Sequence, residues 1–103
     1  MTVKQYEVFW VDLNPTRGSE MSKIRPCVII SPDDINNHLN TIIVAPITST
    51  ERTYLFRVQC DIGYIALDQL RTVDKTRMKD FIQKLSTNQI IEVKRILHEM
   101  LVE

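Results

Sequence analysis

Apolar and polar positions along the chain form short runs of the kind that β-strands make. Residues 5–13 are rich in aromatic and β-branched side chains, and residues 26–31 and 41–47 are nearly continuous apolar runs. These segments are predicted strands, and the continuous run at 26–31 indicates a strand covered on both faces. Between the second and third strands, residues 33–37 are predicted to form a turn or a single helical turn.

The second half of the chain continues this pattern of short strands. Residues 53–59 alternate weakly between apolar and polar side chains, which predicts a strand. The sequence Asp-Ile-Gly at 61–63 predicts a tight hairpin into a further strand over 64–70. Residues 75–78 are predicted to form a short helical turn, and residues 80–85 the last strand. The chain is therefore expected to contain six or so short strands.

The last part of the chain has the period of an amphipathic helix. Ser86 is a good N-cap residue, and Gln89 completes a capping box. Apolar residues then recur at helical spacing, which predicts a helix over 87–101: Ile90, Val93, Leu97, Met100 and Leu101. Short strands followed by one long helix predict a mainly β (α+β) single domain over residues 1–103. We expect a small antiparallel barrel or curled sheet with the helix packed on it.

Composition is that of an ordinary globular protein, and net charge does not point to a partner. The 13 Lys and Arg residues balance the 13 Asp and Glu residues, so global charge gives no argument for binding nucleic acid. Two segments, 17–25 and 71–79, are locally basic. Taken alone, they are most simply explained as two solvated loops.

The cysteines and histidines indicate neither a disulfide-rich protein nor a metal-binding one. Cys27 and Cys60 both lie in strand-like sequence, which favours reduced core thiols in a reducing cytoplasm. His38 and His98 share no plausible spacing with a third ligand, so we predict no metal site. No apolar run approaches the ~18 residues that a membrane-spanning helix needs. We therefore expect a soluble, cytoplasmic protein.

Arg25 and the hydroxyl residues at 48–50 are the first candidates for chemistry. Pro26 disfavours the α region for Arg25, which should be extended at the mouth of its strand. Its charged guanidinium presents a planar fork of donors suited to phosphate, and the hydroxyls could donate to a phosphate or an oxyanion. On residue type alone, simpler roles are favoured: a surface ion pair worth about 0–1 kcal/mol, and turn capping by the hydroxyls.

Glu20 and Asp68 are the carboxylates nearest to the site that these residues would form. Glu20 lies in a polar loop, and Asp68 lies at a strand end. Either carboxylate could act as a general base if its geometry suited the task. Either could equally be a solvated loop residue or hold a turn, and the sequence does not rank the two.

Five motifs, taken together and in order, resemble the MazF/PemK family, the toxin half of type II toxin–antitoxin pairs. They are Gly18-Ser19-Glu20, Arg25-Pro26 with its apolar run, Asn36, Ala45-Pro46-Ile47-Thr48-Ser49 and the segment 67–75. Each motif alone is weak, but the ordered set spans almost the whole chain. The resemblance implies an SH3-like or CcdB-like barrel that forms a homodimer.

The resemblance also implies an activity. It implies a metal-independent, sequence-specific endoribonuclease that needs no cofactor and cleaves single-stranded RNA to 2′,3′-cyclic phosphate and 5′-OH ends. It further implies inhibition by a cognate antitoxin, whose C-terminal segment fills the RNA groove at the dimer interface. Two other classes stay open, because fold does not determine function. They are a gyrase-poisoning toxin of the same fold and a non-catalytic module that retains only an antitoxin-binding surface.

The resemblance assigns roles to residues of this sequence. Arg25 matches the family's catalytic arginine and Thr48 its catalytic threonine. Glu20 matches a loop acid proposed to take part in some members, and Asp68 matches a position proposed as the base in the PemK branch. Substrate binding is predicted for four further residues: Ser19, Lys23, Ser49 and Gln69.

Two positions depart from the PemK branch of the family. Ala66 stands where that branch has an arginine proposed as catalytic acid, and Ser19 stands where it has a histidine. These departures favour a scheme that relies on the arginine and the threonine. The hairpin at 60–63 is also shorter than in many relatives.

Overall fold

The computed structural model describes residues 2–14, 23–50 and 56–102, and the structural statements below concern this part of the chain. The strands are β1 (Glu7–Asp12), β2 (Ile24–Ile29), β3 (Thr41–Thr48), β4 (Arg57–Cys60), β5 (Gly63–Ala66), β6 (Arg71–Asp74) and β7 (Met78–Lys84). The helices are α1 (Asp33–His38) and α2 (Thr87–Leu101), with short 3₁₀ turns η1 (Leu67–Gln69) and η2 (Lys75–Arg77).

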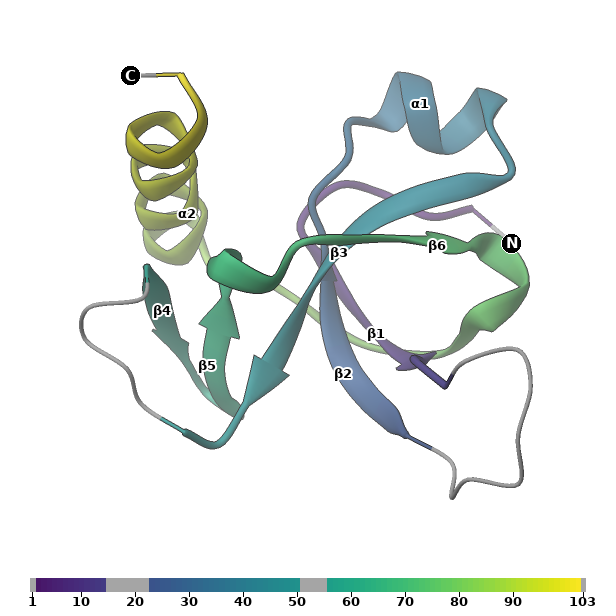
Figure 1. Ribbon diagram of the computed structural model, residues 1–103, viewed down its shortest axis with the longest axis horizontal. Coiled ribbons are helices and arrows are strands. Elements are labelled where there is room, and N and C mark those ends of the chain that lie inside the picture. Colours follow the sequence, from purple (N-terminus) through teal and green to yellow (C-terminus); the bar gives the residue numbers. More distant parts are fainter. Residues whose placement is uncertain (1, 15–22, 51–55, 103) are drawn as a thin grey trace.

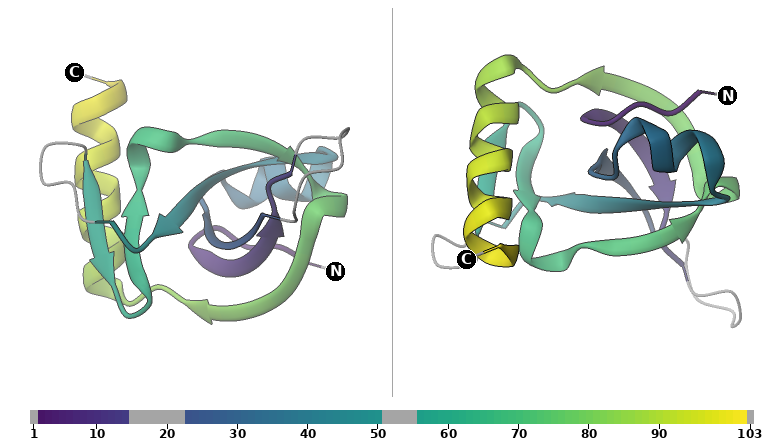
Figure 2. Two further views of the ribbon diagram at one scale, coloured as in Figure 1. Left: turned by 60° about the horizontal axis from the view of Figure 1, so that its bottom comes forward. Right: turned by 90° about the horizontal axis from the view of Figure 1, so that it is seen from above.

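The strands form one antiparallel sheet that curls around itself (Figures 1 and 2). Hydrogen-bonded neighbours follow the order β4-β5-β3-β2-β1-β7, and β6 also pairs with β3. The order ends at β4 and at β7, so among the described residues the sheet is curled but open. Helix α2 packs against β4 at one end of the sheet. The predicted mainly β fold with a C-terminal helix is confirmed.

Strands β2 and β3 lie at the centre and separate two clusters of core side chains. On one face of these two strands, a cluster of side chains packs with residues of α2, β4 and β5: Val28, Ala45, Ile47, Val58, Ile65, Val93 and Ile96. The other fills the inside of the curl: Phe9, Val11, Leu13, Cys27, Ile29, Ile42, Val44 and Val73. Because successive side chains of a strand point to opposite faces, a continuous apolar run serves both clusters. The prediction that the 26–31 segment is covered on both faces is confirmed over 27–30.

Strand β6 was not predicted, because its sequence carries almost no hydrophobic signal. Of its four residues only Val73 is buried. The strand exists because its backbone pairs with residues 41–44 of β3, a partner that is distant in sequence. The same edge of β3 pairs with β5 at Ile47 and Thr48. The predicted strand over 64–70 therefore ends at Ala66. The turn η1 then connects β5, which pairs with one part of β3, to β6, which pairs with another.

Pro46 lies in the gap that this change of partner leaves. On that edge of β3, β6 pairs with residues 41–44 and β5 pairs with residues 47 and 48. A proline cannot donate a ladder hydrogen bond, so it is tolerated where one side of a strand is unpaired. The sequence predicted an edge or a bulge at this position. The structure shows a central strand with a local break in pairing.

Other element bounds differ by a few residues. Strand β2 begins at Ile24, two residues before the predicted start, and the last strand, β7, begins at Met78. The predicted strand over 53–59 falls partly on 51–55, outside the described residues, and β4 begins at Arg57.

Helix α2 has the predicted bounds and the predicted cap. The backbone N–H of Gln89 donates to Ser86 Oγ at 3.1 Å, and the N–H of Ser86 donates to Gln89 Oε1 at 2.9 Å. Both bonds satisfy donors at the helix start, as in a capping box. Of the helices in the described part of the chain, none is long and apolar enough to cross a membrane.

Both cysteines are buried, free thiols, as predicted. Burial raises the pKa of the Cys27 thiol to about 12, and the charges of Arg71 and Arg25 oppose that rise. Burial also raises the pKa of Cys60. An unfolded thiol ionises near pH 8.5, so the folded state holds the Cys27 proton more tightly. This contribution to stability is present below about pH 8.5 and is lost as the pH rises towards 12.

We expect Cys27 in the folded protein to resist alkylation. At pH 8 the low thiolate fraction should slow its reaction with iodoacetamide about 10³-fold relative to an unfolded chain. Peptide mass spectrometry after timed alkylation measures this directly, with urea-unfolded protein as the control. Equal labelling of Cys27 in the folded and unfolded protein would contradict the burial shown here.

Candidate active site

A groove of about 820 Å³ lies where β2 and β3 separate at one end of the curl. The described residues that line it come from β2, β3, η1 and β6 and from the segments next to β1, β2 and η1: Leu13, Lys23, Arg25, Pro46, Thr48, Gln69, Leu70 and Arg71. Arg25, Thr48, Lys23 and Gln69 were candidates from the sequence. The structure brings all four into one groove.

Strand register explains why Arg25 and Thr48 share this groove. Strands β2 and β3 pair antiparallel, and the last pair at this end is Cys27 with Pro46. If the same register is extended by two residues along each strand, Arg25 lies opposite Thr48. Side chains two residues apart lie on the same face of a strand. Since the pairing stops after Cys27–Pro46, the strands separate there, and both side chains are left facing the opening.

The groove also joins the two locally basic segments of the sequence. Lys23 and Arg25 come from the first segment, and Arg71 comes from the second. Arg71 pairs with Val44 of β3, which places it on the same face as Pro46 and Thr48. Three basic side chains therefore line a groove in which no acidic residue is among the described lining residues. A protein with no net charge thus carries a locally basic groove.

The hydroxyl of Thr48 is held by a local hydrogen bond. The backbone N–H of Thr50 donates to Thr48 Oγ1 at 3.2 Å. A hydroxyl has one proton and two acceptor lone pairs, so this bond occupies one lone pair and leaves the proton for another acceptor. Thr48 is half-buried, and Ser49 next to it is exposed and does not line the groove.

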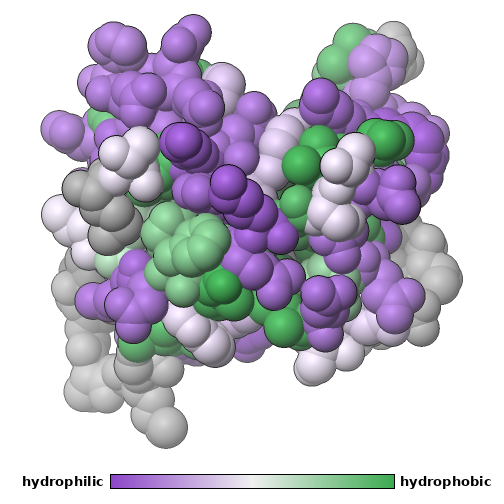
Figure 3. All heavy atoms as spheres, turned by 180° about the vertical axis from the view of Figure 1, so that it is seen from behind, coloured by the Kyte–Doolittle hydropathy of each residue, from purple (hydrophilic) through white to green (hydrophobic). Residues whose placement is uncertain are grey.

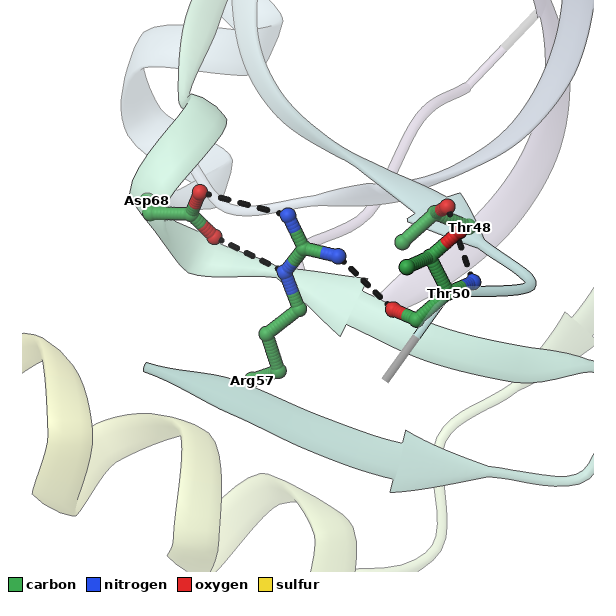
Figure 4. A network of polar contacts seen from close by, with 4 residues as sticks. All are labelled: Thr48, Thr50, Arg57 and Asp68. Atoms are coloured by element: carbon green, nitrogen blue, oxygen red, sulfur yellow. Dashed lines mark hydrogen bonds and ion pairs between the residues drawn. The ribbon is translucent and has the colours of Figure 1, made fainter. Parts of the chain in front are cut away.

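Asp68 lies beside the groove in an ion pair. Its Oδ1 accepts from Arg57 Nε at 3.1 Å and its Oδ2 from an Arg57 terminal nitrogen at 3.4 Å. The other terminal nitrogen of Arg57 donates to the carbonyl oxygen of Thr50 at 2.7 Å (Figure 4). Asp68 is not among the groove-lining residues. The structure therefore places this carboxylate against a cation, whereas Arg25 and Thr48 face the groove.

Glu20 and Ser19 lie outside the described residues. The described residues on either side of 15–22 are hydrogen-bonded to each other. Leu13 N–H donates to the carbonyl oxygen of Lys23 at 3.0 Å, and Lys23 N–H donates to Asn14 Oδ1 at 2.8 Å. Leu13 and Lys23, both of which line the groove, are therefore held together.

Arg71 is the charged groove-lining residue that the sequence analysis did not name as a candidate. The signal was the basic segment 71–79, but the sequence did not say which of its cations would face Arg25. Arg77, from the same segment, donates instead to the backbone carbonyl oxygens of Asp12 and Asn14 at the end of β1. Within the described ranges, no group of three or more His, Cys, Asp or Glu side chains is placed to hold a metal ion.

Fold and groove together define a class of protein: a small, curled antiparallel sheet with a C-terminal helix and a basic, hydroxyl-containing groove. Residues 4–101 match the model of the family described as PemK-like, MazF-like toxin of type II toxin–antitoxin system. The chain is 34% identical over 105 residues to Endoribonuclease MazF of Staphylococcus epidermidis, covering 92% of this chain and 88% of that protein. The chain therefore belongs to the PemK-like, MazF-like toxin family.

Solved structures support the same fold. The MazE-MazF structure (Form-II) from Deinococcus radiodurans matches with a TM-score of 0.85 and 22% identity, over 99% of this chain and 97% of that chain. An endoribonuclease in complex with its cognate antitoxin from Mycobacterial species matches with a TM-score of 0.82 and 21% identity, over 97% and 95%. At these identities the likeness concerns the fold alone.

Proposed function

We propose that the groove is the site at which this endoribonuclease toxin binds and cleaves single-stranded RNA. The observation that carries the proposal is the meeting of Arg25, Arg71, Lys23 and the Thr48 hydroxyl in one groove. Guanidinium groups suit phosphate oxygens because their donors form a planar fork. The S. epidermidis relative is named an endoribonuclease, which supports the same activity here.

The proposed reaction is an internal transfer at phosphorus. A base removes the proton of a ribose 2′-OH, and the resulting oxygen attacks the adjacent phosphorus in line with the 5′-oxygen. The bond to the 5′-oxygen breaks, and that oxygen takes a proton from solvent. The products are a 2′,3′-cyclic phosphate and a 5′-OH. DNA lacks the attacking hydroxyl and is therefore not a substrate.

Arg25 and Thr48 are proposed to stabilise the charge that builds on the non-bridging phosphate oxygens. Donors that are already in place when charge develops lower the barrier most. Glu20 is proposed as the base, because Asp68 is engaged by Arg57 through both oxygens. Lys23, Gln69 and Arg71 line the rest of the groove and are proposed to hold the RNA backbone, with Ser19 and Ser49 contributing at its edge.

We further propose that the protein acts in the cytoplasm as a homodimer and that a cognate antitoxin inhibits it by placing its C-terminal segment in the groove. Several large apolar side chains of the strands are exposed, among them Trp10, Ile24 and Phe81. Figure 3 shows apolar side chains interspersed with polar ones on the side turned away from Figure 1. The match to a family of toxins from type II toxin–antitoxin systems supports the antitoxin as a partner.

Cleavage in the presence of EDTA tests the proposed activity. Purified, antitoxin-free protein should cut a long single-stranded RNA at discrete sites without a divalent metal, and end mapping should find 2′,3′-cyclic phosphate. A substrate with one 2′-deoxyribose on the 5′ side of a mapped cut is the matched control and should resist at that site alone. Intact RNA would instead favour gyrase poisoning or antitoxin binding without catalysis, and inhibition of gyrase separates these two.

A further inference from the structure

Arg57 occupies an unusual position next to the proposed active site, because one guanidinium joins three elements. It extends from β4, binds Asp68 of η1 through two nitrogens, and binds the Thr50 carbonyl oxygen just after β3 through the third. Figure 4 shows the guanidinium between the carboxylate on one side and the turn with Thr48 on the other. Arg57 thus joins the turn after β3 to the body of the protein.

Burial distinguishes this ion pair from the other well-formed pairs. The side chains of Arg57 and Asp68 are 7% and 18% exposed, whereas Arg95 and its partners Glu92 and Glu99 on α2 are about half exposed. Exposed pairs are screened by water and hold little in place. A largely buried pair with two hydrogen bonds keeps a fixed geometry. The Arg57 N–H that donates to the Thr50 carbonyl oxygen therefore has a fixed direction.

The chain of contacts continues from Thr50 to the proposed catalytic hydroxyl. The carbonyl oxygen of Thr50 accepts from Arg57 at 2.7 Å, and the N–H of the same residue donates to Thr48 Oγ1 at 3.2 Å. Both contacts involve one short turn, so fixing the carbonyl also restricts the direction of the N–H. With one lone pair of Oγ1 occupied in this way, the hydroxyl proton remains for a substrate oxygen.

We propose that Arg57, held by Asp68, is a positioning residue that fixes the Thr48 hydroxyl for phosphate stabilisation. The inference rests on the proposed RNA cleavage and gives Asp68 an indirect role, through Arg57, in place of proton transfer. Neither residue needs to touch the RNA. Both residues should raise kcat, because a hydroxyl that samples several orientations stabilises the transition state less than one held in a single orientation.

A double-mutant cycle with Thr48→Val tests this role. Arg57→Ala should lower kcat about 10-fold in the parent and leave KM nearly unchanged, because the three groove cations are retained. In the Thr48→Val background the same change should have little further effect, because no hydroxyl is left to position. Arg57→Lys should restore only part of the activity, since an ammonium cannot span both partners as a fork. Equal losses in both backgrounds would overturn the proposal.

The pH profile of kcat distinguishes positioning from proton transfer by Asp68. Asp68→Asn should lower kcat as Arg57→Ala does, and the acidic limb of the profile should stay where it is in the parent. If Asp68 were the base, this limb would disappear in Asp68→Asn and persist in Arg57→Ala. That result would refute the indirect role.

An activity-independent measurement separates this inference from the proposed function. Side-chain scalar couplings of Thr48 in NMR should report one rotamer in the parent and averaging in Arg57→Ala. Arg95→Ala, which also removes an ion-paired arginine but on α2, is the matched control and should leave Thr48 unchanged. If the parent cleaved no RNA, the proposed function would fail, while the couplings would still decide whether Arg57 orders Thr48. An unaltered Thr48 rotamer in Arg57→Ala would refute this inference and leave the proposed function untouched.

Discussion

Replacing Arg25 with alanine is expected to lower the rate of RNA cleavage by about 10²-fold or more. The estimate follows from the loss of one donor already in place for the charge that develops on phosphate. Arg25 is exposed and lies at the start of β2, so the substitution should leave the fold and the thermal unfolding temperature nearly unchanged. Rates measured with a labelled RNA containing one mapped cut site test this expectation.

Two further variants make the result specific to the guanidinium at this position. Arg25→Lys retains the charge but loses the planar fork, and it should recover only part of the lost rate. Arg95→Ala removes an arginine of α2 that lies outside the groove and should cleave like the parent. If Arg25→Ala cleaved RNA as fast as the parent, Arg25 would have no central role in the mechanism.

Gly63→Ala is expected to be strongly destabilising. Gly63 has a φ of +146°, which side chains rarely adopt. An added Cβ would lie 2.6 Å from the carbonyl oxygen of Thr48 and 3.0 Å from Ile47 Cγ2. Strain of this kind costs about 1–3 kcal/mol, and the overlap adds to it. We expect a loss of at least about 2 kcal/mol, or a fall of roughly 10 °C in unfolding temperature.

The same substitution should also slow cleavage in the protein that remains folded. The clash is with the backbone of Thr48, and β5 pairs with β3 at this residue, so relief of the overlap must move the proposed catalytic turn. Ile62→Ala, in the same hairpin, removes an exposed side chain and should change stability by about 0.5 kcal/mol or less. Calorimetry of the two variants measures the difference. Equal unfolding temperatures would show that the hairpin accommodates a Cβ.

Helix α2 and strands β2 and β3 show what sequence could predict in this fold. Their signals are local: a capping box before a helical period for α2, and continuous apolar runs for the two strands. Strand β6 shows the limit. Its residues are mostly exposed, and it is a strand only because a distant segment offers hydrogen bonds to its backbone.

The candidate site divides in the same way. Arg25 and Thr48 were identified from the sequence by their motifs and by their resemblance to a toxin family. Arg71 lies in the motif at 67–75, but the resemblance assigns it no role, and Arg57 lies in none of the five motifs. Arg71 reaches the groove because β6 pairs with β3, and Arg57 becomes a candidate because it contacts Asp68 and Thr50.

By itself, then, the sequence determined the family, the mainly β class, the C-terminal helix and the residue types of the proposed chemistry. Those properties depend on patterns within short stretches of chain or on their order. Only the tertiary structure decided which cations share a groove and which carboxylate is engaged by an arginine. The physical reason is that both depend on pairing between segments far apart in the chain, where register brings particular side chains to one face.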